Sequence, residues 1–87
     1  MHHVQIFKLF SMVDVAVKKG NYSIAIEIET GELDFIKNIL KNLKAGFDFA
    51  VSVATSYLVE NRIREKLRDK KMDRIKRVKI TTVRASE

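Results

Sequence analysis

The sequence predicts an α/β fold, a mixed β-sheet core flanked by two helices, with the elements in the order βββαβαβ. Three observations support this prediction: two neighbouring segments alternate strictly in polarity, an amphipathic helical repeat follows them, and a mostly apolar run of strand length comes next. With 87 residues the chain can bury one modest core, so we expect a single domain over residues 1–87. Because the sequence has no cysteine, neither disulfides nor cysteine-bound zinc can stabilise it.

A hairpin is the strongest element of this prediction. Residues 22–31 read YSIAIEIETG, with isoleucines on one face and an alanine and two glutamates on the other. Residues 12–19 alternate in the same way, and Gly20-Asn21 between them is a two-residue turn signal. If these two residues form the loop, paired positions sum to 41 and one face is continuously apolar. We expect that apolar face to pack on the core.

The same register brings acidic side chains together. Asp14 lies opposite Glu27, where the Cβ atoms of paired residues are roughly 4.5–5.5 Å apart and like charges destabilise a sheet. A slip of the loop by one residue at each end would instead place Asp14 opposite Ala25, still diagonal to Glu27. Since hard divalent cations need clustered oxygen ligands, we interpret Asp14 and Glu27 as half of a cation site.

The remaining elements follow from periodicity. The predicted elements are a first strand within residues 2–10, helix 32–45, strand 48–54, helix 57–71 and a closing strand over 75–84. Strand 48–54 is almost continuously apolar, which predicts that it is covered on both faces and runs parallel to strand 22–30. The direct start in a strand suggests that an upstream helix is missing or belongs to a longer parent chain.

Both helices are predicted to be amphipathic. The first should turn inward an apolar stripe formed by Leu33, Ile36, Ile39, Leu40 and Leu43. Its other side should be a polar face, either solvated or in contact with phosphates, formed by Lys37, Asn38, Lys41, Asn42 and Lys44. The second helix should bury Leu58, Val59, Ile63 and Leu67. Gly46 is a good stop signal for the first helix.

Charge is distributed unevenly along the chain. Residues 1–60 carry 6 lysines and arginines against 7 acidic residues, whereas residues 61–87 carry 11 against 4. A basic segment of this kind indicates a polyanionic partner, most often nucleic acid, and a solvated face is the alternative. The predicted nucleic-acid-binding residues are Lys18, Lys19, Lys37, Lys41, Arg62, Arg64, Arg68, Lys70 and Lys71.

The hairpin and the segments after it resemble a known superfamily. The residues that carry the likeness are Val13-Asp14-Val15, the AIEIETG run that ends at Gly31, and Ala45-Gly46-Phe47-Asp48 at the start of an apolar strand. They are similar to the restriction-endonuclease-like (PD-(D/E)XK) nucleases, especially archaeal members of the Holliday-junction resolvase branch and nuclease-like domains of archaeal ATPases. The resemblance covers residues 3–84 and implies a restriction-endonuclease-like sheet core that lacks the family's first helix.

Carried over by position, the resemblance implies a catalytic site. Asp14 and Glu27 match the family's two acids and would bind Mg²⁺ or Mn²⁺ together with the backbone carbonyl of Ile28. The family's lysine falls on Glu29, which could hold a water or a second cation but cannot supply a positive charge. Lys37, a turn along the following helix, is the nearest residue to replace that lysine. The implied catalytic residues are Asp14, Glu27, Glu29 and Lys37.

Three functional hypotheses follow. The first is a metal-dependent DNA endonuclease that hydrolyses phosphodiester bonds in duplex or branched DNA. The second is a catalytically inactive nuclease-like fold that acts as a nucleic-acid-binding or dimerisation module, and the third is an unrelated α/β interaction domain. The missing lysine favours the second hypothesis, while three carboxylates on one face favour the first.

The partners are predicted from exposed surface and from the lack of targeting signals. Apolar residues on both sides of the first strand, with no first helix to cover the sheet, predict a homodimer. No apolar run approaches the roughly 18–20 residues of a membrane span, and the N-terminus lacks a signal-peptide pattern. We therefore expect a cytoplasmic protein without a membrane partner.

Overall fold

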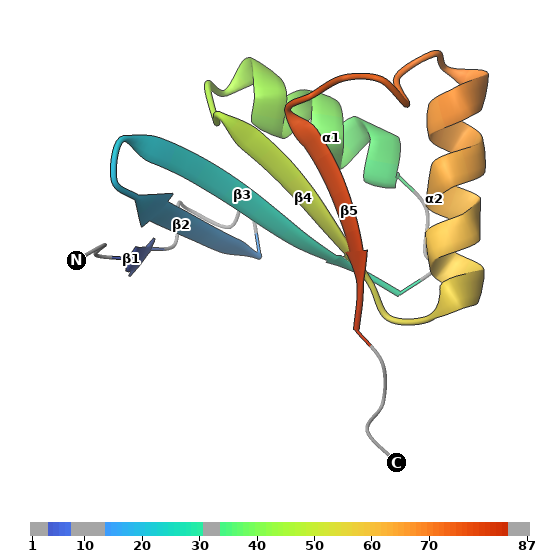
Figure 1. The fold of residues 1–87 in the computed structure, drawn as a ribbon, viewed down its shortest axis with the longest axis horizontal. Coiled ribbons are helices and arrows are strands. Elements are labelled where there is room, and N and C mark those ends of the chain that lie inside the picture. Colours follow the sequence, from blue (N-terminus) through green and yellow to red (C-terminus); the bar gives the residue numbers. More distant parts are fainter. Residues whose placement is uncertain (1–3, 8–13, 31–33, 84–87) are drawn as a thin grey trace.

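The computed structural model describes residues 4–7, 14–30 and 34–83, with side chains from residue 14 onward (Figure 1). The elements are β1 (Val4–Phe7), β2 (Val15–Lys19), β3 (Tyr22–Glu29), α1 (Phe35–Lys44), β4 (Phe49–Ala54), α2 (Tyr57–Asp69) and β5 (Val78–Thr82). The α/β class, with a mixed sheet and two helices, is confirmed. The outer parts of the predicted first strand, residues 2–3 and 8–10, lie outside the described residues, as does Val13.

The strands form one sheet in the order β1-β2-β3-β4-β5. β1, β2 and β3 pair antiparallel, whereas β3–β4 and β4–β5 pair parallel, as predicted for strands 22–30 and 48–54. The two crossovers run in the same direction across the sheet, and such connections are almost always right-handed, so both helices belong on one face. Accordingly α1 contacts β3, β4 and α2, while α2 contacts β4 and β5. In Figure 1 the β2–β3 hairpin extends away from the helices.

The predicted hairpin register is confirmed. Val15 pairs with Ile26, Ala16 with Ala25 and Lys19 with Tyr22, so paired positions sum to 41 and the slipped alternative is wrong. Gly20 has a φ of 59°, the left-handed region that the first central residue of a primed hairpin turn requires. The glycine therefore fixes which side chains of β2 and β3 share a face.

The face of the hairpin that meets the core is the opposite of the predicted one. Ala16 and Ala25 are fully buried and cluster with Phe47, which follows α1. The same face carries Glu27 and Glu29, and both are buried too. The physical reason is space, because a bulky ring and a helix can approach a sheet closely only over small side chains. Isoleucine side chains at these positions would prevent Phe47 and α1 from packing this closely against the sheet.

The isoleucine face is instead left open by both described helices. On β2 and β3 it presents half-buried Val15, Val17, Ile24 and Ile26, and Ile28, which is 50% exposed. On β4 the register adds half-buried Phe49, Val51 and Val53 to it. The prediction that strand 48–54 is covered on both faces is therefore wrong. We call these eight residues the open sheet face.

The main core lies between the helices and the opposite side of the sheet. Ile39, Ile63 and Leu67 are buried there with Ala50 and Ala54 of β4. The helix prediction erred at two positions: Leu40 is 50% exposed and Leu58 is 65% exposed. Each is adjacent in sequence to a buried residue of the same helix, and one step of 100° around a helix moves a side chain off the buried stripe.

The ends of the helices agree with their sequence signals. Ser56 caps α2, its hydroxyl accepting a hydrogen bond from the Val59 amide at 3.2 Å. Gly46, with a φ of 100°, lies just after α1 and ends it. At the other end Asp34 precedes the first turn in a left-handed conformation, and Glu32 and Leu33 lie outside the described residues.

One arginine joins three elements. The Arg77 guanidinium donates to the carbonyl oxygens of Leu43 at 3.2 Å, Asp48 at 3.3 Å and Phe47. Asp48 in turn accepts a hydrogen bond from the Ser23 amide at 2.8 Å. These bonds fasten the start of β5 to the end of α1 and to the starts of β3 and β4.

Arg77→Ala should therefore lower the free energy of unfolding by about 1–3 kcal/mol, since charge-assisted hydrogen bonds to three carbonyls are removed together. Urea unfolding followed by circular dichroism measures the change. Lys76→Ala is the matched control, because Lys76 is an exposed neighbouring cation. Equal losses of stability in the two variants would contradict the structural role of Arg77.

Candidate functional site

The candidate site lies on the helix-covered side of β3. Glu27 and Glu29 are two positions apart, point to the same face and are only 7% and 6% exposed. Carboxylates are rarely buried this deeply without a partner, because removing a charge from water is costly. Each must therefore be compensated by a hydrogen bond, by a cation or by a proton.

Glu27 is held by α1. Its Oε2 atom accepts a hydrogen bond from Asn42 Nδ2 at 3.0 Å and lies 3.8 Å from Lys41 Nζ. Asn42 is 1% exposed, so its placement on a solvated helix face was wrong. The available signal was its position three residues after Ile39, which continues the buried stripe of α1.

Glu29 is less completely satisfied. Asn38 donates a side-chain hydrogen bond to it, but its Oε2 atom is buried and has no hydrogen-bond partner in the described part of the chain. Burial above all, and then the charges of Glu27 and Asp14, raise the pKa of the Glu29 carboxyl above its usual 4.5. The buried Ser52 hydroxyl, on the strand that pairs with β3, likewise has no partner among the described residues.

Asp14 completes the set of acids. It precedes β2, is exposed, and its Oδ2 atom accepts a hydrogen bond from the Ile28 amide at 2.8 Å. The strand pairing that the structure describes begins at Val15, so Asp14 is not paired with Glu27 within the ladder, but the charge of Asp14 contributes to the raised pKa of Glu29. The residues described by the structure nevertheless contain no group of three histidine, cysteine or acidic side chains that could hold a metal ion.

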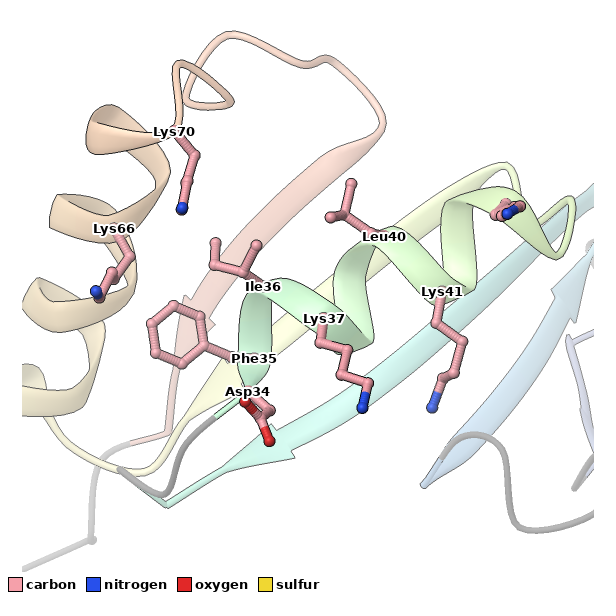
Figure 2. A pocket seen from close by; sticks show the side chains of 9 residues that line it. Asp34, Phe35, Ile36, Lys37, Leu40, Lys41, Lys66 and Lys70 are labelled. Carbon is pink, nitrogen blue, oxygen red and sulfur yellow. The ribbon is translucent and has the colours of Figure 1, made fainter.

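The predicted nucleic-acid-binding residues lie in different parts of the structure and do not form one cluster. Lys37 and Lys41 extend from the same side of α1, and it is Lys41 that lies beside an acid (Figure 2). Lys70 lies near them across a groove, whereas Arg64 and Arg68 line a hollow between α2 and β5. The remaining predicted contacts are exposed, on the hairpin or on and after α2: Lys18, Lys19, Arg62 and Lys71.

Glu29→Gln should stabilise the protein near neutral pH. A carboxyl with a raised pKa in the folded state destabilises the fold as the pH rises through that pKa, and an uncharged amide avoids this cost. We expect the thermal midpoint to rise by roughly 4–8 °C, which corresponds to about 1 kcal/mol in a domain of this size. Below about pH 4, where the carboxyl is protonated in both states, the difference should vanish.

Glu65→Gln is the matched control, because Glu65 is an exposed acid on α2. Calorimetry of both variants in buffers of increasing pH makes the comparison. A gain for Glu29→Gln that is independent of pH would contradict this account.

No relative supports the resemblance to the restriction-endonuclease-like nucleases, so the candidate site is argued from the positions and contacts of its residues. No described helix is long and apolar enough to cross a membrane. Comparison with protein-family models, with curated proteins and with solved structures finds no match to this chain.

Proposed function

We propose that this chain is a metal-dependent phosphodiesterase module that acts on DNA, with Asp14, Glu27 and Glu29 as its acids. The observation that carries the proposal is the buried Glu29 Oε2 atom, which lacks a partner among the described residues beside two further carboxylates. A cation at this point would offset the charge that burial disfavours. The acids are also those that match the nuclease pattern.

The carboxylate oxygens of the three acids are the type of ligand that Mg²⁺ or Mn²⁺ prefers. Mg²⁺ prefers oxygen ligands, keeps several waters and is commonly bound by one or two carboxylates together with substrate phosphates. A site of this sort does not need three preassembled acids, so Glu27 and Glu29 with exposed Asp14 suffice for it. When bound, the cation lowers the pKa of water and offsets charge at a scissile phosphate.

We assign to Lys41 the positive charge that the nuclease pattern requires, in place of Lys37. Lys41 Nζ lies 3.8 Å from Glu27 Oε2, and Glu29 occupies the position of the family lysine. A cation held at this distance from the acids can stabilise the negative charge that develops on a phosphate during hydrolysis. Asn42 positions Glu27 by its hydrogen bond and does not touch the substrate.

The test is a cleavage assay on plasmid, single-stranded and four-way-junction DNA with Mg²⁺ or Mn²⁺. We expect metal-dependent cutting that Asp14→Asn and Glu27→Gln abolish. Lys41→Gln should slow it by about 10²-fold, the scale of removing one positioned donor, whereas Lys76→Gln, at an exposed lysine outside the site and the groove, is the control. Cutting that survives both acid substitutions would refute the assignment.

A second function is favoured by one observation. Glu27 is already engaged by Asn42 and Lys41, as in a structural network that has no need of a metal ion. A nuclease-like fold of this kind would bind nucleic acid without cutting it. Calorimetry separates the two: Mn²⁺ binding that requires Asp14 supports the enzyme, whereas DNA binding without it supports the inactive module. In either case affinity for DNA should fall steeply with salt.

We further propose that a second copy of the chain covers the open sheet face. Three neighbouring strands present eight apolar side chains on this face, and the described helices cover none of it. Contiguous apolar patches with a polar surround mark protein–protein contact sites. The face carries no acidic residue in its described part, and its centre, formed by Ile24, Ile26 and Val51, is aliphatic. Two such faces can pack as stacked sheets about 10 Å apart.

The dimer is tested by light scattering during size-exclusion chromatography. We expect twice the chain mass, and the mass of a single chain for Ile28→Lys, which places a charge within the buried interface. Because Ile28 is 50% exposed in one copy, the variant should still fold. Leu58→Lys, at an exposed leucine on α2, is the control that should stay dimeric. A single-chain mass for the unaltered protein would refute the proposal.

A further inference from the structure

A groove of about 670 Å³ lies along α1 and faces α2 (Figure 2). Its floor is an apolar strip of Phe35, Ile36 and Leu40, and Phe35 and Ile36 also pack against the main core. The described residues that line it include five lysines: Lys37, Lys41 and Lys44 from α1, and Lys66 and Lys70 from α2 and its C-terminal end. Its size falls within the range of ligand sites.

The lysines point to an anionic occupant. Lys37 and Lys41 are four residues apart, as are Lys66 and Lys70, and like charges at this spacing destabilise a helix by about 0.2–0.5 kcal/mol per pair. Asp34 is the one acid among the lining residues described. The helix dipole favours Lys41, Lys44 and Lys66, which lie in the last turns of α1 and α2, and Lys41 also pairs with Glu27. The two rows nevertheless concentrate positive charge along one groove, and a polyanion would convert their mutual repulsion into binding energy.

The apolar floor decides which polyanion fits. In a duplex the bases are stacked inside and proteins reach mainly phosphates and groove edges. Exposed Leu40 and the Phe35 ring between two rows of lysines instead suit a chain that offers apolar ring faces and phosphates together. Single-stranded nucleic acid has this chemistry, because its bases stack on aromatic and apolar side chains while cations follow the backbone.

The groove and the acid site share one residue. Lys41 lines the groove, and its Nζ atom lies 3.8 Å from the buried Glu27 carboxylate. A strand lying along α1 would therefore place a phosphate beside the lysine that contacts the acids on β3. Lys41 is thus the link between the groove and the proposed chemistry.

We propose that this groove binds single-stranded nucleic acid, with phosphates along the two lysine rows and bases against Phe35, Ile36 and Leu40. The proposal rests on the proposed function for what happens to the strand once it is bound. Binding itself requires no divalent cation. The groove thus selects a single strand, or the unpaired arm of a branched structure, in preference to a duplex.

The experiment is fluorescence anisotropy with a labelled thymidine oligonucleotide, in EDTA, across a range of salt concentrations. The variants are Lys66→Gln/Lys70→Gln and, as the matched control, Arg74→Gln/Lys76→Gln. The control pair loses the same charge at two exposed residues that do not line the groove. EDTA keeps this result separate from the cleavage assay, so the groove and the chemistry can fail independently.

We expect the lysine variant to bind about tenfold more weakly. Its slope of log affinity against log salt should be smaller by about 1.4, which is about 0.7 for each phosphate that a lysine no longer neutralises. The control variant should bind as the unaltered protein does. Leu40→Gln should abolish the preference for the thymidine strand over an abasic strand of equal length, because only the bases touch the floor. Leu40 is half exposed, so this variant should fold.

Three results would overturn the proposal. One is equal weakening by the lysine variant and the control variant, which would mean diffuse attraction to the whole basic surface. Another is binding of a duplex of equal length as tightly as the single strand. The third is tighter binding of polyglutamate than of the oligonucleotide, which would mean that the groove accepts an acidic protein segment.

Discussion

The burial of two glutamates on the helix-covered face of one strand is the constraint on which the rest of the structure depends. Glu27 and Glu29 occupy positions where a sheet normally presents apolar side chains to its helices. The helix above them therefore cannot be purely apolar: α1 turns Asn38 and Asn42 toward the acids and places Lys41 at their margin. The main core is displaced toward β4, β5 and α2 as a result.

The same constraint explains why the sheet has one open side. A chain of this size forms two packed layers, and here the helix layer is committed to the side that holds the acids. The apolar face of the hairpin is consequently left open by both described helices. The helix-covered side thus holds both the main core and the buried acids, whereas the other side presents the open sheet face.

Much of the fold could be predicted from sequence because the relevant signals are local. The Gly20-Asn21 turn fixed the register, and alternation identified the strands. Local signals could not decide which face of the hairpin is buried, since that depends on where Phe47 and α1 pack. The isoleucine face was the natural choice by polarity, but the close approach of a ring and a helix requires the alanine face.

The placement of Glu27 and Glu29 on one shared face of a strand could be predicted from sequence, whereas their burial and their partners could not. Asp14, Glu27 and Glu29 follow from register and periodicity, which the sequence specifies. The preference for Lys37 over Lys41 rested on distance along the chain, whereas proximity depends on how α1 is rotated over β3. The charge difference between residues 1–60 and residues 61–87 could not indicate the groove, because one row of its lysines lies before residue 60 and the other lies after it.

The Glu29 Oε2 atom, which has no hydrogen-bond partner among the described residues, is not explained by stability alone. A fold optimised only for stability would replace the acid by an amide or an apolar residue, since a half-satisfied buried polar group costs more than none. Its neighbour Glu27 contacts Lys41, which also lines the basic groove, so acids and lysines meet at one point of α1 and β3. Acids that attract a cation, next to lysines that attract a phosphate, are what hydrolysis of a phosphodiester requires of a protein.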